Sequence, residues 1–417
     1  MPPSSPLSDA SLDDQTPLRI LYHHRIVADD GMRVHVDQIV AALRAAGHTV
    51  HLVGPDAKVG AKKSLTAHAA GLRAHMPAWF GELLEVAYNF PASRRLGRAI
   101  KTFSPDVIYE RYNLFLLAGV WLKTRRGVPL VLEVNAPLAA ERAECGRLHL
   151  TALARWLERA VWRRADIVLP VSDALADYVR DAGVPDERIC IVPNGVPRAS
   201  VVPAGVRARA SETETVTFGF VGFARPWHGL DRVLDVLAKR ADTPTRLMIV
   251  GDGPALPDLR ARATELGIEK RLTFTGPVHH TEVPALLAHV SVALQPDVTP
   301  YASPLKLFEY MAAGCAIIAP DKANIREILE HGETGLLFDP KTPDAFADAV
   351  DALATDGVLR RRLGEAAAAQ VREQDMTWEG NAARIAKVAR ELTGRSGDPV
   401  GGTLRERSEE RRVGKEC

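Results

Sequence analysis

The segment SPLKLFEYMAAG, residues 303–314, predicts a short helix whose two ends are both marked. The hydroxyl of Ser303 can accept a hydrogen bond from an unpaired backbone N–H, as N-cap residues do. Pro304 fits the first helical position, where its missing N–H costs nothing. Gly314 suits the left-handed residue that closes a helix. We therefore expect a helix over residues 304–313.

Lys306 is the unusual residue of this helix, because a lysine in the first turn opposes the helix dipole. It is favourable there if an anion binds at the helix start, where free N–H groups, the dipole and the ammonium group would all point at one guest. Glu309 lies three residues further on, on the same helix face. The alternative is a solvent-facing Lys306–Glu309 pair on an ordinary helix, and the segment alone does not decide between the two.

Short apolar runs alternate with helical patterns on both sides of this segment. Such alternation indicates βαβ units and parallel sheets. The second half of the chain has predicted strands at residues 216–221, 246–250, 272–275, 292–294, 316–319 and 335–338. The first half has a similar set at residues 18–24, 49–53, 106–109, 130–134, 166–171 and 188–192.

The predicted fold class is therefore α/β, with two Rossmann-like domains whose parallel sheets face each other across a cleft. Ligands of such folds bind at the carboxyl ends of strands, and the helix at residues 304–313 starts beyond the strand that ends near Leu294. The expected parts are an N-terminal domain at residues 18–197, a linker at 198–215, a C-terminal domain at 216–376 and an amphipathic helix at 377–393.

The composition of the 417 residues is that of a soluble globular protein, with 46% hydrophobic and 25% charged residues. A net charge of +1 gives no indication of a nucleic-acid partner. The four cysteines are scattered without metal-ligand or disulfide spacing, which fits a reducing cytoplasm. No apolar run is long enough to span a membrane. Residues 1–17, which lack the apolar core of a signal peptide, and residues 394–417 are expected to be disordered.

The loop GFARPWHG, residues 222–229, follows a predicted strand and precedes a predicted helix. Arg225 offers a planar set of donors that suits phosphate, while Gly222 and Gly229 allow close approach to the backbone. The alternative is an exposed loop with an incidental arginine. We favour a functional loop, because Lys306 independently requires an anion at the same sheet edge.

Two features of the first half fall at strand ends as well. Gly31 lies in the loop DDGMR, residues 29–33, where it would allow close backbone approach, although this loop has no dinucleotide fingerprint. Glu133 and Asn135 end a predicted strand and would face the cleft. A capped strand end with a local hydrogen bond explains these two residues equally well.

Two segments bear on larger partners. Residues 141–164 form a basic amphipathic helix, which can lie on an anionic membrane, but packing against a sheet is the favoured interpretation. Residues 56–100 mix basic and aromatic side chains and are the expected acceptor region. The histidines show no metal-ligand spacing, so no metal site is predicted.

Five motifs occur in an order and at spacings that are highly specific together: VPNGV at residues 192–196, FVG at 220–222, IVGDGP at 249–254, FTG at 274–276 and SPLKLFEYMAAG at 303–314. By these motifs the chain, over about residues 18–392, resembles the retaining glycosyltransferases of family 4, the glycosyltransferase group 1 family, which have the GT-B fold. The resemblance implies an N-terminal domain that binds mainly the acceptor and a C-terminal domain that binds mainly the nucleotide sugar, without an obligatory metal. It also implies that the final helix returns to the first domain.

The resemblance implies roles for the residues of the helix. Glu309 matches the second glutamate of the family's E-x7-E motif, which accepts hydrogen bonds from the ribose hydroxyls of the donor. The diphosphate would be held by Lys306 and by the helix start at Ser303, Pro304 and Leu305.

The resemblance also implies roles in the glycine-containing loops. Arg225 is similar to the basic residue that neutralises the diphosphate beside Gly222. His228 precedes Gly229 where many relatives have Lys-Gly, so one expected charge is missing or titratable. Gly31 matches the glycine-rich loop beside the donor phosphate and the acceptor.

The chain departs from the family pattern at two positions. Tyr301 stands where the first glutamate of E-x7-E would contact the donor sugar, and Asp297 is nearby but at the wrong spacing. Asn135 replaces a histidine that often follows the fourth strand of the first domain. We interpret both departures as the pattern of a subgroup.

The predicted function is transfer of a sugar from a nucleoside-diphosphate sugar to a hydroxyl group, with retention at the anomeric carbon, in polysaccharide or glycoconjugate biosynthesis. Lys306 and Arg225 would be the catalytic cations. Two alternatives stay open: another two-Rossmann enzyme of nucleotide sugars, such as an epimerase, and a non-catalytic scaffold that binds a nucleotide sugar.

The expected partners are the nucleotide sugar and a glycan, glycolipid or small-molecule acceptor, with no cofactor and no nucleic acid. The expected location is the cytoplasm, with peripheral contact at the inner face of a membrane. The base, the sugar, the acceptor and the oligomeric state are not specified by the sequence.

Overall fold

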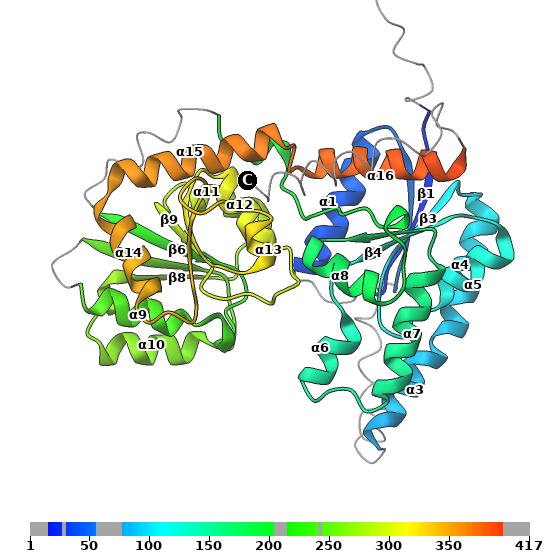
Figure 1. Cartoon of the computed structure of the whole chain (residues 1–417), viewed down its shortest axis with the longest axis horizontal. Coiled ribbons are helices and arrows are strands. Elements are labelled where there is room, and N and C mark those ends of the chain that lie inside the picture. Colours follow the sequence, from blue (N-terminus) through cyan, green and yellow to red (C-terminus); the bar gives the residue numbers. More distant parts are fainter. Residues whose placement is uncertain (1–15, 27–30, 56–76, 204–214, 241–243, 395–417) are drawn as a thin grey trace, which may run out of the picture. The chain divides into compact units, whose positions relative to one another are not determined.

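The structure, a computed structural model, describes residues 16–26, 31–55, 77–203, 215–240 and 244–394. It divides into two compact α/β units (Figure 1). Unit 1 comprises the described residues within Met1–Pro170, Ala176–Ile191 and Ala382–Cys417, and unit 2 those within Val171–Leu175 and Val192–Asn381. Nearly all of the expected leader and tail, and most of the expected linker, lie outside the described residues.

Unit 1 contains a five-stranded sheet in the order β2-β1-β3-β4-β5, and all of its strand pairs are parallel. The strands are β1 Arg19–His23, β2 Thr49–Val53, β3 Val107–Arg111, β4 Leu130–Val134 and β5 Ile167–Pro170. Every residue of β3 and β4 is buried, as expected for central strands of a parallel sheet that is covered on both faces. The strand predicted at residues 188–192 is wrong, because this segment forms only an isolated bridge between Ile189 and Val168.

Helices connect the strands of unit 1. They are α1 Gly31–Ala45, α3 Ala78–Ala87, α4 Asn89–Phe103, α5 Ala118–Arg126, α6 Leu138–Glu144 and α7 Thr151–Arg164. The helix that follows β5, α8 Asp173–Asp181, belongs to unit 1 from Ala176 onward. The single helix predicted over residues 141–164 is therefore two helices. Leu157, Val161 and Trp162 of α7 are buried, whereas Trp156 is 59% exposed, so α7 packs with one face only.

Unit 2 contains a six-stranded parallel sheet in the order β11-β10-β9-β6-β7-β8. The strands are β6 Val216–Val221, β7 Thr245–Val250, β8 Leu272–Gly276, β9 Val292–Leu294, β10 Ala316–Pro320 and β11 Leu336–Phe338. Its helices are α9 Leu230–Ala238, α10 Leu256–Glu265, α11 Val283–Leu287, α12 Leu305–Ala312, α13 Ala323–Arg326, α14 Ala345–Thr355 and α15 Gly357–Glu373. The predicted fold class, two Rossmann-like α/β halves with parallel sheets, is confirmed.

The core of unit 2 lies on both faces of its sheet. Side chains of a strand alternate between faces, so Ala316 and Ile318 of β10 join one apolar cluster while Ile317 and Ala319 join the other. The first cluster includes residues of α9, α10 and α14, and the second includes residues of α11 and α12. Both faces are covered, so ligand access is left to the edges of the sheet.

The last helix, α16 Trp378–Thr393, belongs to both units. Its first turn lies in unit 2, where Asn381 donates from Nδ2 to the carbonyl of Pro193 at 2.7 Å. From Ala382 onward it lies in unit 1, with the apolar residues Ala382, Ile385 and Ala389 buried. The chain thus passes from unit 2 back to unit 1 within a continuous helix.

Across the described ranges, no helix combines the length and the apolar character that crossing a membrane requires.

Candidate functional site

The helix α12 starts at the carboxyl edge of the unit 2 sheet. The backbone N–H of Val221, the last residue of β6, donates to the Tyr310 hydroxyl at 2.8 Å. The same hydroxyl lies 3.4 Å from the carbonyl oxygen of Leu294, the last residue of β9. Tyr310 therefore fixes the helix against the ends of two neighbouring strands, where ligands bind in folds of this class.

The predicted N-cap role of Ser303 is wrong. Pro304 occupies the cap position, and the helix begins at Leu305. The Ser303 hydroxyl instead accepts from the backbone N–H of Asn194 at 3.1 Å, and its carbonyl accepts from Asn194 Nδ2 at 2.5 Å. Ser303 thus ties the segment before the helix to residue 194, and the side chain leaves the N–H groups of the first turn for another acceptor.

Lys306 lies across the end of β6. Its Nζ is 3.9 Å from the centre of the Phe220 ring, a distance typical of a cation–π contact. Gly222 has φ +124°, and a Cβ at this position would lie 3.3 Å from Lys306 Nζ, so glycine leaves room for the ammonium group. Burial lowers the pKa of Lys306 to about 7, although the nearby Glu309 opposes this shift. A group that is costly to charge in the free protein would gain from a bound anion.

Glu309 lies one helical turn after Lys306 and is largely buried. Burial raises the pKa of its carboxyl to about 7, and the charge of Lys306 partly offsets this effect. Glu309 Oε1 also lies 3.4 Å from Nδ1 of His280, which follows β8. Burial lowers the pKa of His280, which favours the neutral imidazole. The carboxyl of Glu309 is therefore held between α12 and the loop after β8.

The loop of residues 222–229 presents one free cation and one neutral imidazole. The Arg225 side chain is exposed and forms no ion pair with the described residues, and its Cζ lies 5.2 Å from the centre of the Phe223 ring. His228 Nδ1 accepts from the backbone N–H of Arg225 at 3.0 Å. Burial, with the charges of Lys306 and Arg225, lowers the pKa of His228 to about 3. His228 is therefore neutral at pH 7 and orients the loop, which favours the first of the two alternatives stated above, a missing charge rather than a titratable one.

Two glycines after β7 support this loop. A Cβ on Gly251 would lie 2.3 Å from the carbonyl oxygen of Gly222, and a Cβ on Gly253 would lie 2.1 Å from that of Ala224. The backbone N–H of Ala224 donates to the carbonyl of Asp252 at 2.6 Å. The motif at residues 249–254 therefore serves the site by letting two backbone segments touch.

The segment of residues 297–303, which contains Tyr301, is held through its carbonyl groups. Tyr301 is buried, and its carbonyl accepts from the Ser172 hydroxyl at 2.7 Å. Asn324 Nδ2 donates to the carbonyl of Thr299 at 3.0 Å and to that of Ala302 at 2.6 Å. Lys322 forms an ion pair with Asp297 at 2.6 Å. The segment thus has a fixed conformation beside the start of α12.

Glu133 lies at the end of β4 in unit 1 and is 2% exposed. It accepts from the Tyr109 hydroxyl at 2.8 Å and from Asn135 Nδ2 at 2.5 Å, and it contacts Arg111 and His35. Burial alone would raise the pKa of Glu133, but His35 and Arg111 hold it well below its usual range. The structure therefore places Glu133 as a buried, ionised group that orients its neighbours, and its hydrogen bond with Asn135 favours the second of the two alternatives, a strand end with a local hydrogen bond.

Two other predictions concern the loop at Gly31 and the absence of a metal site. Gly31 is the first residue of α1, and the residues immediately before it, 27–30, lie outside the described residues. In the part of the chain that the structure describes, no group of His, Cys, Asp and Glu side chains could hold a metal ion.

Comparison with known proteins identifies the family. The profile described as glycosyl transferases group 1 matches residues 206–370, and the profile described as glycosyl transferase 4-like domain matches residues 30–195. Together they cover most of the chain, one for each half. The chain is a group 1 glycosyltransferase. It belongs to family 4 and is an enzyme of the transferase class.

Characterised relatives share about a quarter of their residues with this glycosyltransferase. A GDP-mannose-dependent alpha-mannosyltransferase of Mycobacterium tuberculosis is 28% identical over 339 residues, covering 77% of this chain and 84% of that protein. The alpha-D-kanosaminyltransferase of Streptomyces kanamyceticus is 27% identical over 253 residues, covering 58% of this chain and 65% of that protein.

Solved structures confirm the GT-B fold. HepE of Anabaena, in complex with UDP, superposes with a TM-score of 0.68 at 18% identity, covering 89% of this chain and 99% of that one. Sucrose-phosphate synthase of Thermosynechococcus elongatus superposes with a TM-score of 0.69 at 17% identity, covering 91% of this chain and all of that one.

Sequence reasoning missed two contributors to the site of the glycosyltransferase. His280 was grouped with histidines of no assigned role, although its place just after β8 puts it on the same sheet edge as Gly222. Asn324 follows β10 at the same edge and gave no motif signal. A search for polar residues after each predicted strand, rather than for named motifs, would have found both.

Proposed function

We propose that this glycosyltransferase binds a nucleoside-diphosphate sugar in unit 2 and transfers the sugar to a hydroxyl group with retention, without a metal. The observation that carries the proposal is the position of Lys306, a cation made costly by burial at the open start of α12. The dipole of α12, the backbone N–H groups of its first turn and the ammonium group of Lys306 together suit a diphosphate. The relatives support this choice, since one is GDP-mannose-dependent and HepE binds UDP.

The difficult step of such a transfer is departure of the diphosphate while positive charge grows on the sugar. Lys306, Arg225 and the N–H groups at the start of α12 would stabilise the leaving group as its charge develops. The bond between the anomeric carbon and the phosphate oxygen breaks, and a bond to the acceptor oxygen forms on the same face. The departing phosphate takes the acceptor's proton, so the chain itself need not supply a base.

Glu309 would accept from the ribose hydroxyls of the donor, with His280 holding its carboxyl in place. Tyr301, in its fixed segment, would contact the donor sugar where many relatives use a glutamate. Glu133 would act through Arg111 and Asn135, which it orients on the side where the acceptor is expected to bind.

A panel of UDP-, GDP- and ADP-sugars tests the reaction class. Slow donor hydrolysis with release of the nucleoside diphosphate supports a transferase, because water then replaces the acceptor. Interconversion of the donor sugar would instead support an epimerase, and binding without any turnover across many acceptors would support a scaffold.

Binding of a nucleoside diphosphate should weaken as the pH rises above about 7. Lys306, with a pKa near 7 in the free protein, must be protonated to hold the diphosphate, so binding takes up a proton at higher pH. The affinity for UDP, or for GDP if the panel selects it, should fall by up to about tenfold per pH unit between about pH 7.5 and 9.

Titration calorimetry in buffers of different ionisation enthalpy measures both the affinity and the proton uptake. The variant Lys306→Arg stays protonated throughout and should bind with a flatter pH profile. An equally flat profile in the wild-type protein would refute the assignment of Lys306.

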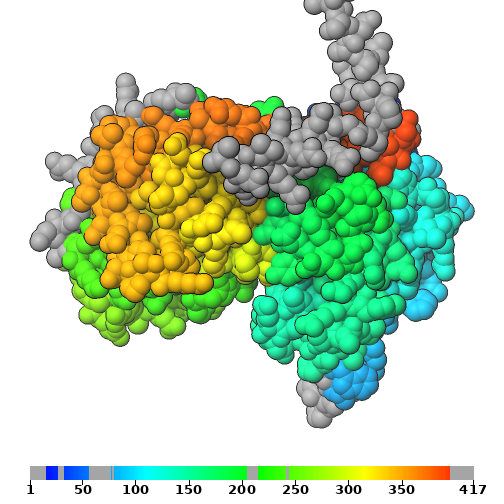
Figure 2. All heavy atoms as spheres, viewed as in Figure 1, coloured from blue at the N-terminus to red at the C-terminus, as the bar shows by residue number. Residues whose placement is uncertain are grey.

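We also propose peripheral contact of unit 1 with an anionic membrane surface, in the cytoplasm. Exposed apolar side chains follow one another at helical spacing on α3 and at the start of α4, with Trp79 44%, Leu83 39% and Phe90 67% exposed. The exposed basic residues Arg94 and Arg98 continue this face, and α4 contains no acidic residue. Figure 2 shows α3 at the outer surface of unit 1, as the blue segment at the bottom of the view. An apolar face followed by cations is typical of interfacial helices.

Cosedimentation with vesicles tests this contact. The double variant Trp79→Ser/Phe90→Ser should lower partitioning onto vesicles containing phosphatidylglycerol by at least about tenfold, since each side chain contributes roughly 2 kcal/mol when buried in the interface. Val358→Ser, which removes a 68% exposed apolar side chain of unit 2, is the matched control and should have no effect. Equal binding of the wild-type protein to neutral vesicles would contradict the role of the basic residues.

A further inference from the structure

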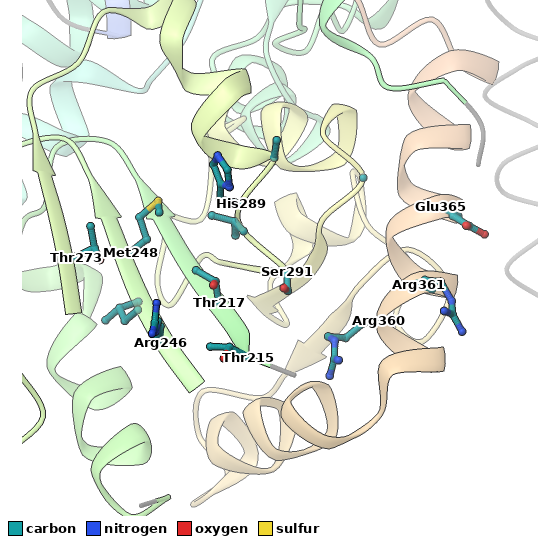
Figure 3. A pocket seen from close by; sticks show the side chains of 14 residues that line it. Thr215, Thr217, Arg246, Met248, Thr273, His289, Ser291, Arg360, Arg361 and Glu365 are labelled. Atoms are coloured by element: carbon teal, nitrogen blue, oxygen red, sulfur yellow. The ribbon is translucent and has the colours of Figure 1, made fainter. Parts of the chain in front are cut away.

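A cavity lies at the edge of the unit 2 sheet opposite the donor site, where the strands begin. Its volume is about 660 Å³, within the range of small-molecule sites. Figure 3 shows the strand residues Thr217 and Arg246 on one side and Arg360 of α15 on the other, with Ser291 between them. The lining residues are Thr215, Thr217, Arg246, Leu247, Met248, Thr273, together with Ala288 to Ser291, Gly314, Arg360, Arg361 and Glu365. The proposed donor site uses none of these residues.

The cavity wall carries an excess of positive charge. The described lining contains three arginines, Arg246, Arg360 and Arg361, but only one carboxylate, that of Glu365. The ring of His289 adds a further possible donor. Part of this excess has an ordinary explanation, because cations are favoured near the carboxyl ends of helices. Arg360 serves α14 in this way, since its Nη1 donates to the carbonyls of Leu353 at 2.7 Å and Ala354 at 3.1 Å.

The charge and the hydrogen-bond donors of Arg360 are nevertheless only partly paired. It is 8% exposed, and within the described chain no carboxylate pairs with it and its Nε has no hydrogen-bond partner. Burial lowers the pKa of Arg360, which means that its charge is costly where it lies. The nearby charge of Asp356 offsets this cost only in part, so the Arg360 charge is stabilised further when an anion comes near.

Arg246 lies in a strand, so the explanation given for Arg360, a cation at the carboxyl end of a helix, does not apply to it. It is exposed at the start of β7, and it forms no hydrogen bond or ion pair with any residue that the structure describes. The imidazole of His289 is also exposed and without such a partner in the described ranges. Two donor groups at the cavity wall are therefore available to a ligand, in addition to the buried charge of Arg360.

The rest of the wall indicates what kind of anion fits. The hydroxyls of Thr217, Thr273 and Ser291 can exchange hydrogen bonds with the hydroxyls of a polyol, and an arginine fork suits a phosphate. We propose that this cavity binds a small phosphate monoester of a polyol, of the size of a hexose phosphate, with Arg246 as its main phosphate ligand. This site is separate from the donor site and does not depend on the proposed function.

Titration calorimetry on the full chain tests the proposal with mannose 6-phosphate, mannose, inorganic phosphate and AMP. We expect mannose 6-phosphate to bind more tightly than inorganic phosphate or AMP, and mannose not to bind. Arg246→Ala should weaken the binding of mannose 6-phosphate by about tenfold or more, the scale of losing a charge-assisted contact. Arg246 is exposed, so this variant should fold normally.

Two control variants test whether the ligand binds in this cavity. Arg262→Ala removes another exposed arginine of unit 2, one paired with Asp235 on a different helix, and should leave binding unchanged. Lys306→Ala should also leave it unchanged, which separates this cavity from the donor site. The proposal is overturned if the sugar phosphate does not bind, if Arg246→Ala binds it as the wild type does, or if Lys306→Ala abolishes binding. Equal affinity for inorganic phosphate would overturn the polyol assignment.

Discussion

Replacing Lys306 by alanine is expected to lower kcat/KM by at least about 10²-fold, the scale of losing one preorganised group that stabilises developing charge. Its Nζ lies over the Phe220 ring and beside Gly222, at the open start of α12. The loss should appear mainly in kcat, because the charge of the leaving group grows in the transition state.

The same variant should fold as well as the wild type. Burial makes the Lys306 charge costly in the free protein, whereas its removal leaves Glu309 without the charge that partly offsets its own burial. These two effects oppose each other, so the free energy of unfolding should change little. Lys239→Ala, which removes an exposed lysine at the end of α9, is the matched control. A Lys306→Ala enzyme with a rate within about threefold of the wild type would rule out the diphosphate role.

Replacing Glu309 by alanine is expected to weaken donor binding by about 10- to 100-fold, as for the loss of hydrogen bonds to a charged group. The effect should fall on KM and on the Kd of the nucleoside diphosphate more than on kcat, because the ribose contact is present before and during the reaction. Glu309→Gln keeps the shape of the side chain and one hydrogen-bond acceptor. It should therefore weaken donor binding less than Glu309→Ala does.

A deoxyribose nucleotide makes this test specific. The wild-type enzyme should bind the 2′-deoxy diphosphate more weakly than the ribose form, whereas Glu309→Ala should bind the two alike, as a double-mutant cycle requires for a direct contact. If Glu309→Ala still discriminates between the two nucleotides as the wild type does, the carboxyl does not read the ribose.

Most strands and the end of α12 could be predicted because their signals are local. Apolar runs alternate with helices through both halves, and Gly314 indeed closes α12 with φ +65°. Ser303 could not be predicted correctly, because the same hydroxyl can cap a helix or accept from a distant backbone N–H. Only the fold brings Asn194 within reach of it.

Long-range effects account for the other differences. The charge state of His228 depends on burial and on two cations brought near by folding, which no spacing rule contains. The segment at residues 188–192 is apolar like a strand, but only Ile189 finds a bridging partner in the described sheet. The cavity beside Arg246 involves residues of β6, β7, β8 and α15, so no single stretch of sequence marks it.

The division of α16 between the units has a consequence for the order in which the chain folds during synthesis. Unit 2 is complete once Asn381 has left the ribosome, since all of its segments precede that residue. Unit 1 starts at the amino end but still lacks Ala382, Ile385 and Ala389, which are buried in it. On the ribosome, the half translated first must therefore wait for the last described helix before its core closes, while the half translated second can already be folded.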